Sequence, residues 1–202
     1  MSWANNHINE CNKIAQRSPR GVRRAALIAI LSIRKAWRTV PDQLNDVLLN
    51  GVNSKYLSGW KRQAFKFLWD DDNIDYLYAG TMTAEERIDL LDLWMTVPGL
   101  GLAKAGFVCQ LTRGTIGCLD SHNVKRYGVD ERALKFNKNL SAKARMLKQE
   151  AYIHLTDKIG GSHYLWAEWC YLMAGKYPTV YDQPQAVSRQ HVDLMQVGRK
   201  GA

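Results

Sequence analysis

The chain has 202 residues, enough for one large domain or two small, closely packed lobes with a sizeable core. Its formal net charge is +9, and the excess is uneven: residues 1–40 carry eight Lys or Arg against one acid, residues 41–100 five against ten, and residues 101–202 fifteen against eight. Basic ends around an acidic middle favour a polyanionic partner such as DNA, although a basic surface can also simply keep a protein in solution.

Cysteine spacing and hydropathy exclude several further classes. The four cysteines, Cys11, Cys109, Cys118 and Cys170, include no C-x2-C pair. The spacing therefore argues against zinc and iron–sulfur clusters, and we expect reduced thiols and no cofactor. The first 16 residues are too polar for a signal peptide, and the apolar run 25–33 is too short to cross a bilayer. We expect a cytoplasmic protein with no membrane partner.

Apolar residues recur at spacings of three and four along nearly the whole chain, which predicts an all-α protein. In chain order, helices are predicted over 4–16, 19–40, 41–51, 53–69, 83–97, 103–111, a short segment starting at Asp120 or Ser121, 141–160 and 163–174.

Local start signals support several of these helices. Ser18 before Pro19, the capping box that begins at Thr83, and Ser141 are typical first residues. The acidic run 70–72 predicts a solvated turn rather than a metal site. We expect a single domain over 1–175, followed by a polar arm or tail at 176–202.

Residues 98–101 read Pro-Gly-Leu-Gly between two predicted helices. The small residues let the backbone bend sharply and approach a phosphate, which the free N–H groups at the start of the second helix would hold. Leu100 would plug this turn into the core. Any helical corner can use such a turn, so its meaning depends on the residues downstream of it, namely Lys104 and, one short helix later, Asp120.

Asp120 opens the run Asp-Ser-His-Asn at the predicted start of a helix, where the helix dipole favours a negative charge. In a cleft, such a carboxylate can stabilise a cationic transition state or accept a proton from a nucleophile. The structural alternative is a plain N-cap. His122 and Asn123 would either polarise a substrate or hold the turn.

The hairpin and Asp120 together resemble the helix-hairpin-helix (HhH-GPD) DNA glycosylase superfamily, in which a catalytic Asp in a Val-Asp-x-His context follows the hairpin. The likeness extends over about 20–130, where residues 26–32 look like the early core helix and residues 56–64 look loosely like a helix with a Tyr-x-x-Lys-Ala pattern. Residues 140–202 show no such likeness.

The resemblance implies an all-α, HhH-GPD glycosylase-like fold with two helical lobes, a cleft between them and the hairpin at about 83–112. It implies that Asp120 faces the cleft and that His122 and Asn123 assist it. A monovalent cation at the hairpin is left open. The DNA contacts that the resemblance and the basic charge suggest are Gly99, Leu100, Gly101, Lys104, Arg34, Lys125 and Arg126.

The chain also departs from the family pattern. Members with lyase activity place a Schiff-base Lys two residues after the second hairpin glycine, where this chain has Ala103. Lys104 is rotated from that position by about 100° on a helix, so we expect it to point toward the DNA backbone and expect no lyase activity. Ile33 and Arg34 stand where many members have a wedging Gln, and the four-cysteine cluster loop is missing.

These departures leave three functions open. The chain leans toward phage proteins that resemble this superfamily, the glutamyl/putrescinyl thymine pyrophosphorylase type, thought to replace a pyrophosphate on a 5-hydroxymethyl pyrimidine with an amine from an amino acid or polyamine. The alternative is a monofunctional DNA glycosylase acting on a flipped base. The third is a non-catalytic hairpin module that binds DNA, associated with a phage particle. The aromatic residues Tyr164, Trp166, Trp169 and Tyr171 would serve as a stacking platform for an unstacked base or as core.

Overall fold

A computed structural model describes residues 3–33, 35, 39–130, 134–136 and 139–173, and every regular element in that part of the chain is a helix. The all-α prediction is confirmed, whereas the two-lobe arrangement stays a prediction. Arg34 and the predicted arm at 176–202 lie outside the described residues. The elements are α1 (Trp3–Gln16), α2 (Pro19–Leu31), α3 (Val40–Asn50), the 3-10 helix η2 (Gly51–Asn53), α4 (Trp60–Trp69), α5 (Asp71–Thr83), α6 (Arg87–Met95), α7 (Leu102–Thr112), α8 (Ser121–Arg126), α10 (Ala142–Ile159) and α11 (Gly161–Met173).

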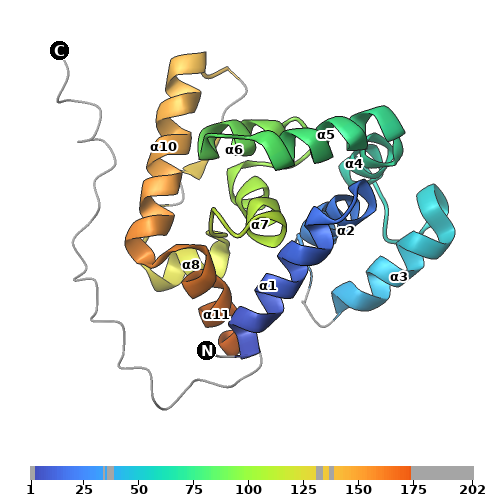
Figure 1. The fold of residues 1–202 in the computed structure, drawn as a ribbon, viewed down its shortest axis with the longest axis horizontal. Coiled ribbons are helices and arrows are strands. Elements are labelled where there is room, and N and C mark those ends of the chain that lie inside the picture. The colour runs from blue at the N-terminus through green and yellow to red at the C-terminus, as the bar shows by residue number, and fades with distance from the viewer. Residues whose placement is uncertain (1–2, 34, 36–38, 131–133, 137–138, 174–202) are drawn as a thin grey trace.

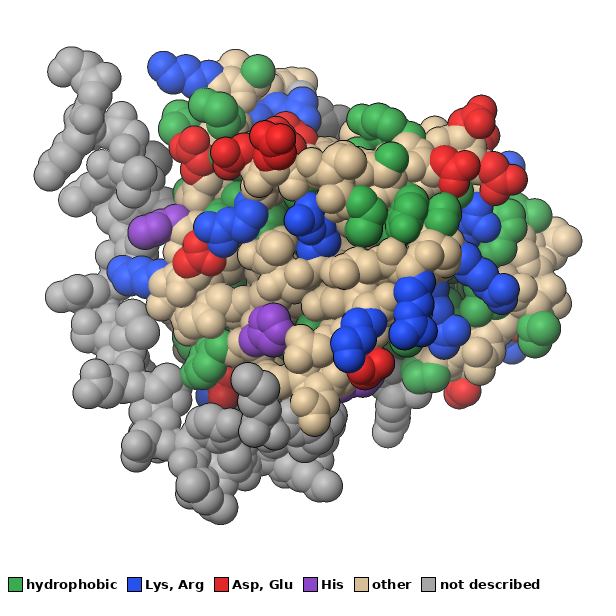
Figure 2. All heavy atoms as spheres, in the orientation of Figure 1, with side chains coloured by type: hydrophobic (Ala, Val, Ile, Leu, Met, Phe, Trp, Pro, Cys, Tyr) green, Lys and Arg blue, Asp and Glu red, His purple; other side chains and the backbone are tan. Residues whose placement is uncertain are grey.

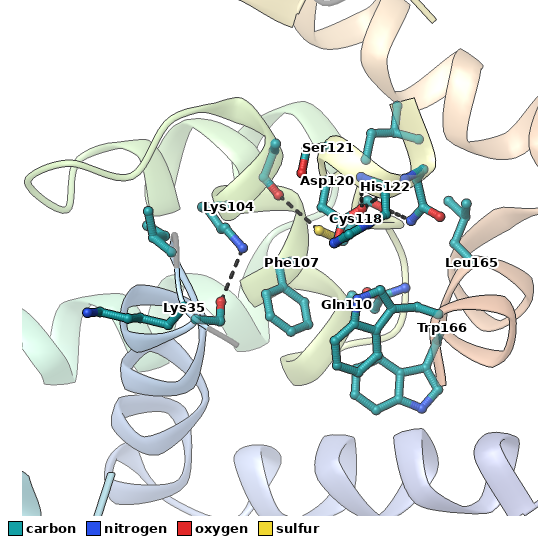
Figure 3. Close-up of a pocket in the computed structure, with 16 residues that line it drawn as sticks. Lys35, Lys104, Phe107, Gln110, Cys118, Asp120, Ser121, His122, Leu165 and Trp166 are labelled. Carbon is teal, nitrogen blue, oxygen red and sulfur yellow. Dashed lines mark hydrogen bonds between the residues drawn. The ribbon is translucent and has the colours of Figure 1, made fainter. Parts of the chain in front are cut away.

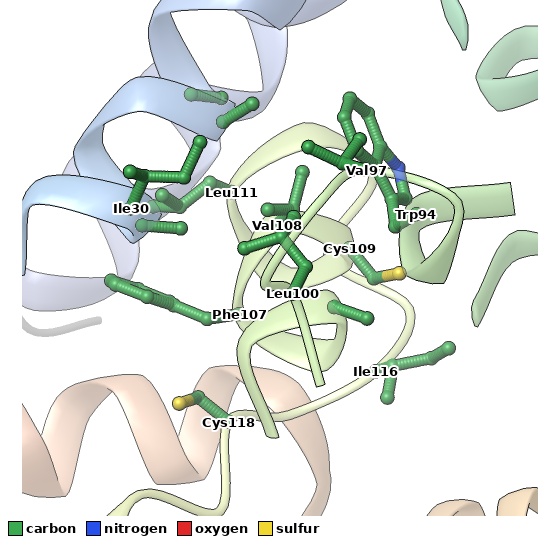
Figure 4. Packing of buried hydrophobic residues seen from close by; sticks show 14 of the residues in the cluster. Ile30, Trp94, Val97, Leu100, Phe107, Val108, Cys109, Leu111, Ile116 and Cys118 are labelled. Atoms are coloured by element: carbon green, nitrogen blue, oxygen red, sulfur yellow. The ribbon is translucent and has the colours of Figure 1, made fainter. Parts of the chain in front are cut away.

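The central element is α7, which packs against α1, α2 and α6 (Figure 1). Residues 105–112 of this helix are all buried. A helix that is buried all round is expected to be mostly apolar, and the two buried polar side chains of α7, Gln110 and Thr112, donate hydrogen bonds to the carbonyls of Ser162 and Val108. Figure 4 shows Val108 and Leu111 of α7 in one cluster with Ile30 of α2 and with Leu100 from the turn before α7.

Local capping signals located several helix starts correctly. The Ser18 hydroxyl accepts a hydrogen bond from the Gly21 N–H, and the Ser141 hydroxyl accepts one from the Ala144 N–H, each at 3.3 Å. Both helices begin at the residue after the cap, as predicted. None of the helices in the described part is long and apolar enough to cross a membrane.

Two predicted helices in the first half are too long. The second helix ends at Leu31 instead of residue 40, and the Lys61 ammonium donates hydrogen bonds to the free carbonyls of Leu31 and Ile33 there, each at 3.3 Å. The helix predicted over 53–69 begins only at Trp60. Gly59 precedes it with a φ of 51°, a left-handed conformation that interrupts a regular helix.

The acidic run is solvent-exposed, as predicted, but only Asp70 lies in the bend between α4 and α5, and Asp71 and Asp72 begin a helix. Asp70 caps α5 by accepting a hydrogen bond from the Asn73 N–H at 3.0 Å, and Asp71 and Asp72 occupy the first turn, where the helix dipole favours negative charge. The predicted capping box does not start a helix at Thr83. Thr83 is its last residue and donates its hydroxyl to the Ala79 carbonyl at 2.9 Å, so the hairpin begins with α6 at Arg87.

The charge segregation of the sequence reappears on the surface. In the face shown in Figure 2, acidic side chains gather along the upper edge, with some Lys and Arg side chains beside them, and further Lys and Arg side chains lie lower down, over α1 and α2. A polyanion would approach the basic side of this face rather than its acidic edge.

Candidate active-site pocket

A pocket of about 460 Å³ lies where the end of α2, the first half of α7, the start of α8 and the middle of α11 meet (Figure 3). It brings together residues that are far apart in the sequence. Asp120, His122 and Asn123 line it from α8, Lys104 lines it from α7, and aromatic side chains form much of the remaining wall. Polar groups converging in a mostly apolar concavity are typical of a small-molecule or base-binding site.

Asp120 both caps a helix and faces this pocket. One carboxylate oxygen, Oδ1, accepts hydrogen bonds from the N–H groups of His122 and Asn123, at 3.0 and 2.9 Å. The other oxygen forms no hydrogen bond within the described residues, and the side chain is half-buried. The cap and the catalytic interpretation are therefore compatible, since one oxygen fixes the carboxylate and leaves the other for a ligand.

Two side chains fix the loop that leads into Asp120. The Asn123 amide donates to the Cys118 carbonyl at 2.8 Å, so Asn123 holds the turn rather than presenting its amide to the pocket. The Tyr152 hydroxyl donates to the Gly117 carbonyl at 2.9 Å and accepts from the Leu119 N–H at 3.0 Å. Tyr152 is fully buried in α10, and this burial raises its pKa well above 10. The hydroxyl thus stays protonated and keeps both bonds.

Gly106 makes room for that tyrosine. A Cβ atom at position 106 would lie 2.4 Å from the Tyr152 hydroxyl oxygen, much closer than two non-bonded atoms can come. Neither residue is predicted as part of the site from the sequence. Nothing local marks them, because the contact joins Gly106 of α7 to a residue of α10 that follows it by 46 positions.

Lys104 also faces the pocket. Its ammonium donates to the Ser32 hydroxyl at 3.1 Å and lies 5.1 Å from the centre of the Phe107 ring. The expectation that Lys104 points toward the DNA backbone stays a prediction, and the side chain lines the same pocket as Asp120. The pocket wraps around the first turn of α7, so that neighbouring positions 103 and 104 both line it, and a long side chain reaches further into it than a short one.

The aromatic wall consists of Phe107, Trp166 and Trp169. The two indole rings are stacked, with centroids 5.4 Å apart and planes inclined by 28°. Trp166 belongs to the core and Trp169 is partly exposed, and both line the pocket. Tyr164 packs against Gly160 outside the lining. The Tyr171 side chain lies outside the described part.

The turn between α6 and α7 leaves its backbone open to approach at Gly101. Leu100 is buried as predicted, and Gly99 has a φ of 80° with the Trp60 ring directly against it. The N–H groups of Gly101, Leu102 and Ala103 find no acceptor within the described residues. Nothing lies within 4 Å of a Cβ atom placed on Gly101, so an anion can approach the backbone there.

The remaining predicted site residues differ in whether their side chains are exposed or already paired within the protein. His122 is exposed at the pocket rim, and its ring forms no hydrogen bond in the described part of the chain. Lys125 is exposed as well. Arg126 instead pairs with Glu168 of α11 at 2.5 Å, so it ties α8 to α11 and is less available for a DNA phosphate.

The described residues offer less support for a cysteine nucleophile or a metal site than for a carboxylate. The Cys118 thiol donates to the Ala103 carbonyl at 3.5 Å, and burial raises its pKa to about 12, which removes it as a nucleophile at neutral pH. No group of three or more His, Cys, Asp or Glu residues that could hold a metal ion occurs among the described residues.

Comparison with known proteins found no matching family model, no matching curated protein and no matching solved structure.

Proposed function

We propose that the protein is a DNA-binding enzyme of the HhH-GPD glycosylase-like fold that modifies an extruded pyrimidine base, with an amine replacing a pyrophosphate on the 5-methylene carbon. The observation that carries this proposal is Asp120, which keeps one oxygen free in a pocket large enough for a base and walled by stacked indoles. The hairpin beside the pocket would hold the DNA backbone while the base occupies the pocket.

In the proposed reaction the nitrogen of an amino acid or polyamine attacks the 5-methylene carbon of the base. A carbon–nitrogen bond forms, the carbon–oxygen bond breaks, and pyrophosphate leaves with the electron pair of that bond. Asp120 accepts the proton that the nitrogen loses. His122 lies at the rim, where it would orient the incoming amine.

The decisive experiment supplies duplex DNA containing uracil, 5-hydroxymethyluracil or its pyrophosphorylated form, together with amino acids or polyamines. The DNA is then digested and its nucleosides are weighed by mass spectrometry. The expected result is a nucleoside in which the amine has replaced the pyrophosphate, with the mass of the 5-hydroxymethyl nucleoside plus the amine minus water, formed only from the pyrophosphorylated base. Release of free base would instead identify a glycosylase, and DNA binding without either product would identify a binding module.

Asp120→Asn is the matched variant for this assay. Asn is about as good an N-cap as Asp, so the turn should keep its two hydrogen bonds and lose only the negative charge. We expect turnover to fall below detection while DNA affinity and melting temperature stay within error of the wild type. Equal losses of affinity, stability and turnover would show that Asp120 is structural only.

Lys104 supports a second candidate, a glycosylase with lyase activity, because its amine faces the same pocket as Asp120. Such an enzyme forms a Schiff base between a lysine and the opened sugar. Borohydride reduction during turnover would then trap a covalent protein–DNA adduct, and Lys104→Gln would abolish it. The transferase gives no adduct under the same conditions.

A further inference from the structure

Three lysines from different parts of the chain gather where α2 ends at the pocket. Lys104 from α7 reaches the Ser32 hydroxyl at 3.1 Å, and Lys61 from α4 reaches the Leu31 and Ile33 carbonyls, each at 3.3 Å. Lys35 follows Ser32 by three residues and lines the pocket with Lys104. We call Ser32, Lys35, Lys61 and Lys104 the lysine subsite.

The positive charges of this subsite have no counterion among the residues that the structure describes, where none of the three lysines forms an ion pair. The mutual repulsion is evident at Lys61, which is only 9% exposed: burial lowers its pKa, and the nearby charges of Lys35 and Lys104 lower it further. A bound anion would relieve this repulsion.

The hydrogen bonds of the subsite leave donors for such an anion. The Ser32 hydroxyl donates to the Ala29 carbonyl at 2.8 Å, so its oxygen is the acceptor for Lys104. An ammonium has three N–H donors, and this bond uses one of them. The Lys104 ammonium donates to Ser32 at the pocket wall. In Figure 3 the Lys35 side chain points away from Lys104. Lys104 is therefore the inner charge of the subsite and Lys35 the outer one.

We propose that the lysine subsite binds the phosphoryl oxygens of the group that leaves the base, a pyrophosphate or phosphate ester on the 5-methylene carbon. This inference rests on the proposed transferase function and assigns it a leaving-group site. The departing group carries the electron pair of the broken carbon–oxygen bond, and fixed ammonium groups stabilise the negative charge that develops on it. Asp120 and the lysine subsite then have separate tasks in one pocket, the first toward the amine and the second toward the anion.

The test measures binding of inorganic pyrophosphate by calorimetry in metal-free buffer at low ionic strength. The proteins are the wild type, Lys104→Gln, Lys104→Arg and Lys66→Gln. Lys66 is the matched control, because it is an exposed lysine on α4 that does not line the pocket. We expect saturable binding that Lys104→Gln weakens at least about tenfold, the loss typical of one charged hydrogen bond. Lys104→Arg should keep most of the affinity and Lys66→Gln all of it, with all four proteins melting alike.

Two results would overturn the subsite. One is an absence of saturable binding in the wild type, and the other is an equal loss in Lys104→Gln and Lys66→Gln. A further experiment tests whether the anion bound by Lys104 is a phosphate of the DNA backbone. If Lys104 contacts the backbone, unmodified duplex will displace pyrophosphate, and Lys104→Gln will reduce the slope of log K against log salt for that duplex by about 0.9. That outcome also refutes a leaving-group site.

The experiments can refute the lysine subsite without refuting the proposed function, and the reverse. Amine transfer with the same kcat and the same KM in Lys104→Gln and the wild type would keep the function and remove the subsite. Pyrophosphate binding that depends on Lys104, in an enzyme that releases free base, would keep the anion site and remove the transfer reaction.

Discussion

Replacing Tyr152 by Phe removes a single oxygen atom and with it the two hydrogen bonds that hold the loop before Asp120. The Leu119 N–H loses its acceptor at 3.0 Å and the Gly117 carbonyl loses its donor at 2.9 Å. Tyr152 and Leu119 are almost completely inaccessible to water, at 0% and 1% exposed, so solvent cannot replace the hydroxyl. Each buried group left without a partner costs about 1–3 kcal/mol, and we expect Tyr152→Phe to lower the free energy of unfolding by about 2–4 kcal/mol.

Denaturant unfolding measures this loss directly, and the melting temperature should fall by about 4–16 °C for a chain of this size. Tyr76→Phe makes the same atomic change at a side chain that is 62% exposed, and it should change stability by less than about 0.5 kcal/mol. Equal stability of the two variants would show that the Tyr152 hydroxyl does not hold the loop.

Gly106→Ala extends this prediction. Its Cβ would meet the Tyr152 hydroxyl at 2.4 Å and two ring carbons at 2.9 Å, so the substitution alone should cost about 1–3 kcal/mol through overpacking. Removing the hydroxyl relieves the closest of these contacts. The double variant should therefore lose less stability than the sum of the two single variants, and strict additivity would show that the two residues do not interact.

Two further predictions concern the hairpin and the buried thiols. Gly101→Ala should fold normally, because its φ is −91° and its Cβ has free space, but it should weaken DNA binding if a phosphate lies against that backbone. Gly99→Ala should also lose stability, because its φ is 80° and the Trp60 ring would lie 2.2 Å from the new Cβ. Filter binding measures the DNA affinity of the two variants, and melting curves measure their stability. A Gly101→Ala protein with unchanged DNA affinity would remove the phosphate from this turn. Burial raises the pKa of Cys118 from 9.0 to about 12, so between these values the folded state keeps a proton that the unfolded chain loses, and stability should fall as pH rises from 9 toward 12. Urea unfolding at a series of pH values should show that the free energy of unfolding falls less steeply with pH in Cys118→Ala than in the wild type. An unchanged slope would show that other groups cause the pH dependence.

The sequence revealed those parts of the fold that are governed by local chemistry. Ser18, Asp120 and Ser141 start helices because a side-chain oxygen accepts an N–H two or three residues later, and this interaction needs no other part of the chain. Thr83 shows the limit of that reasoning. The capping box at Thr83 is an equally good local start signal. In the structure, however, Thr83 is the last residue of the helix that Asp70 starts thirteen residues earlier.

Lys104 shows a second limit. Helix geometry gave its rotation relative to position 103 but not the width of the pocket around the first turn of α7, which depends on α2, α8 and α11. For the same reason the Asp120 carboxylate could be predicted, whereas the partners of its loop could not. Tyr152 comes thirty-two residues later and reaches the loop only through tertiary packing.

The two charged ends of the pocket are held in different ways, and the difference fits the tasks proposed for them. Asp120 is fixed by two backbone N–H groups, and its loop is fixed by the buried side chains of Tyr152 and Asn123. Lys104 is held by one hydrogen bond to Ser32 at the end of a flexible side chain. A proton acceptor must stay within hydrogen-bond reach of one atom, which requires a fixed position. An anion that moves away as its bond breaks needs a charge that can follow it, and an ammonium on four methylene groups can do so.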